Sequence, residues 1–205
     1  MDVTHPLYRA QARTPTARRR IEWADELARI AEGGEVEFTT VVPGAFVDLC
    51  VGSGFWGFDV KGRKAVLYDG GRGRQTGCSL RFVGECVARV VGMEEGSTRN
   101  RRLRVAEVEY EGREVLGELE GAVGGRWEVE EREFGELERE EGGLMRRGEM
   151  GEAYERWVIR GNMGGEGFAR FEDGLLWGEE GWMKLERRTL RQIIQDVVEE
   201  KGKSG

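Results

Sequence analysis

Histidine and cysteine are scarce in this chain of 205 residues, which holds one histidine and three cysteines. The histidine is His5, and the cysteines are Cys50, Cys78 and Cys86, without any C-x-x-C spacing. Zinc sites need clusters of these two residue types at short, regular spacings. We therefore expect no metal site, and three reduced thiols in a cytoplasmic protein.

Long apolar runs are also missing from the sequence. No stretch approaches the roughly 18 residues that a membrane span needs, and residues 1–6 are too polar for a signal peptide. The formal net charge of −7 disfavours a nucleic-acid surface, which requires a basic face. We expect the arginine clusters within residues 18–20 and 99–104 to lie on solvated edges. The composition therefore predicts a cytoplasmic protein that binds neither membrane nor nucleic acid.

Proline is rare, with 3 residues, whereas glycine is abundant, with 33. Many glycines fall inside segments with a helical pattern, where each costs roughly 1 kcal/mol relative to alanine. We therefore expect frayed helices and marginal stability. Two of the three prolines lie in residues 1–15, which show no periodicity and are predicted to be an irregular N-terminus.

The rest of the chain alternates between helical and strand patterns. Apolar residues at steps of three and four predict a helix over residues 16–32, and a β-branched run predicts a strand over residues 36–42. Because that run is continuously apolar, we expect a central strand buried on both faces of a parallel sheet. Further helices are predicted over residues 80–93, 112–123, 134–145, 150–159 and 185–199, further strands over 64–68, 102–108 and 127–131, a turn at 175–178 and a disordered tail over 201–205.

The carboxyl end of the predicted strand 36–42 is the expected ligand position. The strand stops at a Pro-Gly pair and continues into Phe46, and ligands of open α/β sheets lie just beyond such strand ends. The loop of residues 52–57 follows, and its Phe55 and Trp56 are predicted to cover an apolar pocket. We expect Phe46 and Trp56 to border the main pocket of the protein.

Residues 52–57 read Gly-Ser-Gly-Phe-Trp-Gly and match the pattern G-x-G-x-x-G. In a dinucleotide site a helix begins inside this loop and directs its N–H groups at the pyrophosphate. Here the strand predicted over residues 64–68 follows instead, and two aromatic side chains crowd the backbone. The loop is therefore predicted to wall a pocket and not to bind phosphate.

Several segments, in this order, resemble the second half of NmrA-like, isoflavone-reductase-like proteins, particularly the fungal members. The resemblance is carried by residues 37–48 (EFTTVVPGAFVD), 57–71 (GFDVKGRKAVLYDGG) and 79–84 (SLRFVG), and it covers about nine tenths of the chain. It implies an α/β fold: a partial Rossmann-like domain with a mostly parallel sheet, lacking the N-terminal dinucleotide-binding half, plus a small C-terminal substrate lobe. Residues 16–200 would form this NmrA-like domain, as the C-terminal portion or a fragment of such a protein.

The resemblance also implies roles for particular residues and a cofactor, NADP or NAD. The residues implied to flank the nicotinamide are Pro43, Gly44, Ala45 and Phe46, and those implied to contact a small aromatic or secondary-metabolite substrate are Phe55, Trp56 and Met163. Arg20 takes the position of a catalytic lysine, and it keeps the charge but cannot exchange a proton near neutral pH. Phe82 takes the position of an aspartate at a helix start.

Three functions remain open. The first is an NAD(P)H-dependent reductase acting on a small molecule, and the second is an NmrA-type regulator that binds a dinucleotide and a partner protein without chemistry. The third is an inactive fragment. No segment before residue 16 offers a strand, a glycine turn and a helix start in succession, so we expect the chain to bind NADPH weakly or not at all.

Overall fold

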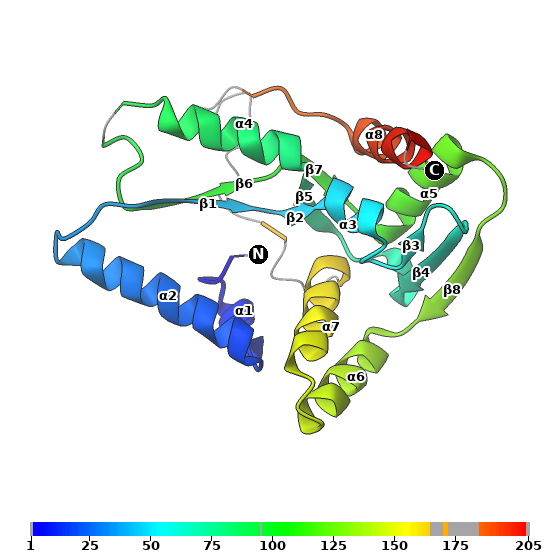
Figure 1. The fold of residues 1–205 in the computed structure, drawn as a ribbon, viewed down its shortest axis with the longest axis horizontal. Coiled ribbons are helices and arrows are strands. Elements are labelled where there is room, and N and C mark those ends of the chain that lie inside the picture. Colours follow the sequence, from blue (N-terminus) through cyan, green and yellow to red (C-terminus); the bar gives the residue numbers. More distant parts are fainter. Residues whose placement is uncertain (1, 95, 165–169, 172–184, 204–205) are drawn as a thin grey trace.

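The computed structural model describes residues 2–94, 96–164, 170–171 and 185–203, and it mixes helices and strands (Figure 1). The helices are α1 (Pro6–Gln11), α2 (Pro15–Glu32), α3 (Val47–Ser53), α4 (Leu80–Val91), α5 (Gly112–Val123), α6 (Phe134–Arg146), α7 (Met150–Met163) and α8 (Leu190–Lys203). The strands are β1 (Thr39–Pro43), β2 (Ala45–Phe46), β3 (Phe58–Asp59), β4 (Lys64–Tyr68), β5 (Gln75–Cys78), β6 (Arg101–Val105), β7 (Val108–Tyr110) and β8 (Glu128–Arg132).

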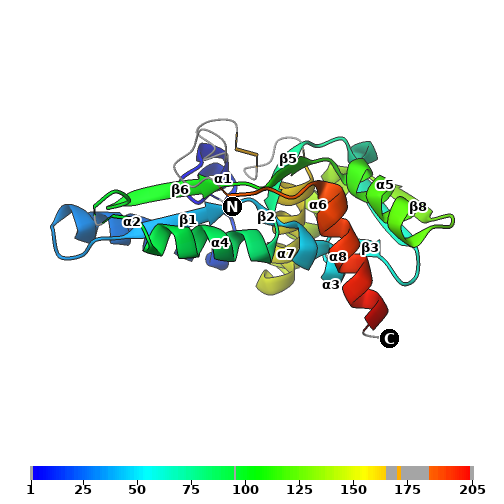
Figure 2. The same ribbon diagram turned by 90° about the horizontal axis from the view of Figure 1, so that it is seen from above.

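The described strands form three small sheets that follow one another along the molecule (Figure 2). β1 pairs with β6 in parallel. β5 lies between the parallel β2 and the antiparallel β7, and β4 lies between the antiparallel β3 and the parallel β8. Parallel strands separated by helices are the mark of an α/β fold, so the predicted class and the mostly parallel pairing are confirmed.

The chain changes from one sheet to the next at Gly44. The Gly44 N–H still donates to the Val105 carbonyl oxygen of β6, at 3.1 Å, whereas the following residues pair with β5. A Cβ atom at Gly44 would lie 2.5 Å from the Thr76 carbonyl oxygen. Because the two backbones approach so closely, only glycine fits at this position.

The strand predicted over residues 36–42 is wrong in its extent and its burial. β1 begins at Thr39, Val36 is 41% exposed, and Val42 is the β1 residue that is buried. Among the described strands, β6 is the one neighbour of β1, so the opposite edge, here called the open edge of β1, pairs with no described strand. The apolar run indicated a strand, but the number of its neighbours depends on segments elsewhere in the chain.

Most other predicted elements lie close to the observed ones. α2, α4, α5, α6, α7, β4 and β8 agree within a few residues, and the strand predicted over residues 102–108 is divided into β6 and β7. The irregular N-terminus contains α1, which begins with His5 as its cap and Pro6 at its first turn. α8 begins later than predicted and includes residues 201–203 of the expected tail. The turn predicted at residues 175–178 lies outside the described residues.

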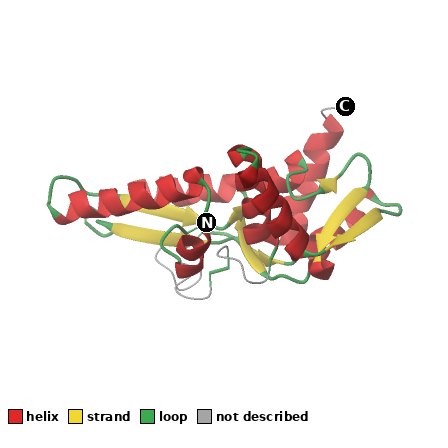
Figure 3. Cartoon of the chain, turned by 90° about the horizontal axis from the view of Figure 1, so that it is seen from below, coloured by secondary structure: helices red, strands yellow, loops and turns green. Residues whose placement is uncertain are grey.

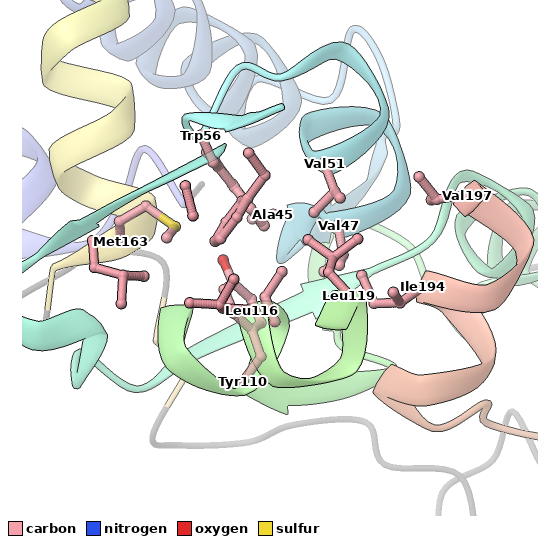
Figure 4. Packing of buried hydrophobic residues seen from close by; sticks show 14 of the residues in the cluster. Ala45, Val47, Val51, Trp56, Tyr110, Leu116, Leu119, Met163, Ile194 and Val197 are labelled. Carbon is pink, nitrogen blue, oxygen red and sulfur yellow. The ribbon is translucent and has the colours of Figure 1, made fainter. Parts of the chain in front are cut away.

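The main hydrophobic core lies where α3, α5 and α8 meet β2, β4 and β7. Trp56 stacks on Tyr110 with ring centroids 5.2 Å apart, and Leu119 and Ile194 are fully buried. Figure 4 shows Trp56, Met163 and Leu116 gathered around the same interior space. Since a fully buried large apolar side chain contributes about 1.5–3 kcal/mol, this cluster is the principal source of stability.

A buried polar network fixes the start of α4. The Ser79 hydroxyl caps the helix by accepting from the Phe82 N–H, and it donates to the carboxylate of Glu107, which is 3% exposed. Arg188 donates to the same carboxylate from the segment before α8, at 3.1 Å. The polar contact that Phe82 cannot supply at this helix start is therefore provided by Ser79 and a distant glutamate.

The β1–β6 pair occupies one end of an elongated molecule and the β3–β4–β8 sheet the other (Figure 3). In Figure 1, α4 lies above the β1–β6 pair and α2 lies below it. α4 packs Phe82 and Cys86 against Val105 of β6. None of the described helices is long and apolar enough to cross a lipid bilayer.

Candidate functional site

A groove of about 1110 Å³ runs along the open edge of β1, and it is called the β1 groove below. It is lined by Val3, Arg20, Trp23, Ala24, Leu27, residues 40–46, Cys50, Phe55, Val83, Val87, Arg102, Gly151, Tyr154, Glu155, Val158 and Asn162. Most of these side chains are apolar. Such a cavity, with few polar groups at defined places, is typical of a small-molecule site.

The β1 groove follows the edge of the strand and not one of its faces. Successive side chains of a strand point to opposite faces, yet all of residues 40–43 line the groove. Trp23 and Leu27 of α2 form one wall, and Val83 and Val87 of α4 form the opposite one. The groove therefore spans the space between the two helices that lie on either side of β1.

One end of the β1 groove coincides with the carboxyl end of β1. Residues 43–46 line it there, together with Cys50 of α3 and Phe55 of the following loop. In open α/β sheets the carboxyl ends of parallel strands are the usual position of the ligand. The fold thus places the groove where the chain order predicted a ligand.

One face of α7 forms a further wall of the β1 groove. Gly151, Tyr154, Val158 and Asn162 recur at steps of three and four, so they share one side of the helix. The Arg20 guanidinium donates a 2.8 Å hydrogen bond to the Tyr154 hydroxyl oxygen. This bond joins α2 to α7 at the groove, and it places a hydroxyl and a cation side by side.

Burial raises the pKa of two groups in or near the groove, the Cys50 thiol and the Tyr8 phenol. Burial raises the pKa of the Cys50 thiol to about 12, helped by the Asp48 carboxylate, so Cys50 is neutral at pH 7 and not a nucleophile. Burial also raises the pKa of Tyr8, which packs edge-on against Trp157 of α7, to about 12, although the Arg20 charge opposes the shift. Of these two groups, the Cys50 thiol lines the groove, and it does so in its neutral form.

The structure brings most of the predicted site residues to one place and separates two of them. Six of the predicted site residues line the β1 groove: Arg20, Pro43, Gly44, Ala45, Phe46 and Phe55. Trp56 is 1% exposed and, like Met163, belongs to the main core cluster, and neither lines this groove. The Trp56 ring stacks on Tyr110 inside the domain, so the expectation that Trp56 borders the main pocket is not met at this groove.

Sequence reasoning missed Tyr154 and Asn162 as groove residues. The helix predicted over residues 150–159 includes Tyr154 but stops short of Asn162, whereas α7 continues through Met163. The spacing of Tyr154, Val158 and Asn162 at steps of four was the available signal. It could be used only after the helix was known to extend that far.

The loop of residues 52–57 follows the carboxyl end of a helix, which disfavours phosphate binding. α3 ends at Ser53, and Gly54 adopts a left-handed cap with φ of 77°. The short β3 comes next, and then β4, the strand that was predicted to follow the loop. The carboxyl end of a helix carries a partial negative charge, which repels a phosphate. Lys61 and Lys201 line a smaller cavity of about 320 Å³ beside the loop, but no helix start directs its N–H groups there. Among the described residues, no group of three or more His, Cys, Asp or Glu is arranged to hold a metal ion.

Comparison with known proteins supports the fold. No protein-family model and no curated protein matches the chain. Among solved structures it is similar to a nucleoside-diphosphate-sugar epimerase from Staphylococcus aureus, with 15% identity and a TM-score of 0.59, over 85% of this chain and 58% of that one. The chain thus spans less than two thirds of that protein's length. Similarity at this identity concerns the fold alone, and the chain has a partial Rossmann-like α/β fold.

Proposed function

We propose that this chain forms the substrate-binding part of an NAD(P)H-dependent oxidoreductase of the NmrA-like, isoflavone-reductase-like kind, acting in the cytoplasm on a small aromatic or secondary-metabolite molecule. The observation that supports this is the convergence of Arg20, residues 43–46 and Phe55, singled out by resemblance, on one groove. That groove lies at the carboxyl end of a parallel strand in a Rossmann-like fold, where ligands bind.

The residues of the groove suit the nicotinamide ring of a dinucleotide but not its pyrophosphate. Residues 43–46 present an apolar surface on which a nicotinamide ring can lie. The loop of residues 52–57, in contrast, follows a helix end and lacks the N–H groups that hold a pyrophosphate. A reduced nicotinamide, when bound, supplies a hydride. The chain's own residues bind and orient the substrate.

Arg20 acts in this proposal through Tyr154. Because the guanidinium occupies an acceptor position of the Tyr154 oxygen, the hydroxyl hydrogen is left to donate to a substrate oxygen. Arginine itself does not exchange a proton near neutral pH. Tyr154 therefore holds the transferable proton, and Arg20 orients the hydroxyl and stabilises negative charge on it. Phe46 and Phe55 keep water from the bound molecule.

Titration of the purified chain with NADPH and NADH, followed by assay of their oxidation with a panel of aromatic ketones and enones, tests the proposal. We expect the panel to bind, and NADPH alone to bind weakly or not at all, because the described residues provide no pyrophosphate site. A stoichiometric, micromolar NADPH complex would contradict that expectation. A panel that does not bind would refute the assignment of the groove to a substrate.

The alternative is an NmrA-type regulator that binds a dinucleotide and a protein partner without chemistry. The observation that favours it is Arg20, which replaces the lysine expected of a reductase and cannot act as an acid or base. Dinucleotide binding without oxidation in the same assay would support the regulator. Absence of any binding would indicate an inactive fragment.

A further inference from the structure

Asn162 is a lining residue of the β1 groove, and its side-chain amide oxygen is a buried atom without a hydrogen-bond partner among the described residues. The whole residue is 5% exposed. The Asn162 carbonyl oxygen accepts a 2.9 Å bond from the buried Tyr110 hydroxyl, which fixes this point of α7 to the core. Since a buried amide oxygen without a donor is costly, the position is suited to a donor from a bound molecule.

Tyr154 lies on the same wall, nearer the start of α7. It precedes Asn162 by eight residues, which separates their backbones by about 12 Å along the axis of α7. Arg20 and Arg102 line the groove as cations, against the single carboxylate of the exposed Glu155. A hydroxyl donor that lies beside the Arg20 cation favours an anionic acceptor, such as a carboxylate.

The wall between these two polar groups is apolar. Val158 lies between them on the same face of α7, and Ala45, Phe46 and Phe55 line the groove as well. Aromatic side chains favour flat ring systems, which bury a large area without losing many rotamers. Along α7 the groove thus offers the Asn162 amide, the apolar Val158 and then the Tyr154 hydroxyl beside the Arg20 cation.

We propose that the β1 groove recognises a flat, apolar carboxylic acid that carries a hydroxyl or N–H group at the opposite end. Asn162 Oδ1 accepts a hydrogen bond from that group, and Tyr154 donates to the carboxylate, whose charge Arg20 balances. Asn162 is then the residue that distinguishes ligands with a terminal donor from those without one. The inference rests on the proposed function only in that both assign a small molecule to this groove.

The probe is a hydroxybiphenylcarboxylic acid with its two polar groups at opposite ends, together with one relative that lacks the hydroxyl and one that lacks the carboxylate. Calorimetric titration of the full chain, without any dinucleotide, measures their affinities. We expect the hydroxyl to strengthen binding roughly tenfold, as one hydrogen bond to a buried acceptor does. The variant Asn162→Leu should abolish that ratio, and Tyr154→Phe should weaken the preference for the carboxylate. Tyr68→Phe, which removes a hydroxyl outside the groove, should change neither ratio.

Equal affinities of the parent probe and its hydroxyl-free relative for the unmodified chain would overturn the inference, and so would a tenfold ratio that persists in Asn162→Leu. The first comparison needs no substitution, so misfolding of a variant cannot obscure it. Failure of all three probes to bind also overturns it. A hydroxyl-dependent ratio without binding of the aromatic ketones and enones would leave the inference standing and refute the proposed function, whereas binding of that panel without the ratio would do the reverse.

Discussion

The two ends of the molecule are packed in different ways. Around α3, α5 and α8 a single cluster of large apolar side chains is buried, with Trp56 among its members. At the β1–β6 end, α2 buries three alanines, Ala17, Ala24 and Ala31, and its Trp23 is 68% exposed. Because an alanine removes little apolar surface from water, α2 gains far less from packing than α5 or α8.

This difference explains where the groove lies. Regions with few buried apolar contacts open at a lower free energy than the core, and binding sites are commonly drawn from them. The β1 groove is formed by α2 and β1 of the weakly packed end, but its inner wall, α7, is tied to the core through Tyr110. A ligand bound between α2 and α7 would add contacts to the weakly packed end of the molecule and so stabilise it.

Truncation of a core aromatic is expected to have the largest effect. Trp56→Ala should lower the free energy of unfolding by about 3–5 kcal/mol, because it removes the ring that stacks on Tyr110 and leaves a cavity. Urea denaturation measures this. A loss below about 1 kcal/mol would mean that the two ends do not differ as described.

Asp2 forms a buried ion pair at the weakly packed end of the molecule. It is 2% exposed and lies 2.7 Å from the Arg104 guanidinium of β6. Although burial alone raises the Asp2 pKa, hydrogen bonds from Thr4 and Arg104 outweigh this and lower it below 3.8. An aspartate with a lowered folded-state pKa contributes stability above the unfolded value and loses it as the pH falls through the folded value.

The variant Asp2→Asn should therefore cost about 1–3 kcal/mol at neutral pH, since the charged hydrogen bond between Asp2 and Arg104 is lost. Below about pH 4 the difference between the two proteins should shrink, because Asp2 itself becomes protonated. Thermal unfolding as a function of pH measures both. A difference that stays constant down to strongly acidic pH would contradict the role assigned to the Asp2 charge.

The smallest effect is expected for Trp23, the surface counterpart of Trp56. Trp23→Ala should change the free energy of unfolding by no more than about 0.5 kcal/mol, because the side chain is mostly exposed. The same variant should weaken binding of an apolar ligand in the β1 groove, which Trp23 lines. If its unfolding cost approached that of Trp56→Ala, the two ends would be equally well packed.

Local patterns determined most of the helices and strands. The spacing of apolar residues in α2, α4 and α5 is a property of neighbours within one turn or two, so it can be read without the rest of the chain. The Pro-Gly pair at residues 43–44 indicated where β1 ends for the same reason. Local order also indicated that no helix begins inside the loop of residues 52–57, since strands come next.

Tertiary structure alone decided which of these residues share a site. Phe55 and Trp56 are adjacent and both aromatic, yet Phe55 is partly buried and lines the groove, whereas Trp56 is fully buried and stacks on Tyr110. Asn162 reaches the groove only because α7 docks against the core at Tyr110. The open edge of β1 depends on which strands pair with it, and that choice is made by segments distant in sequence, whose contacts no local pattern encodes.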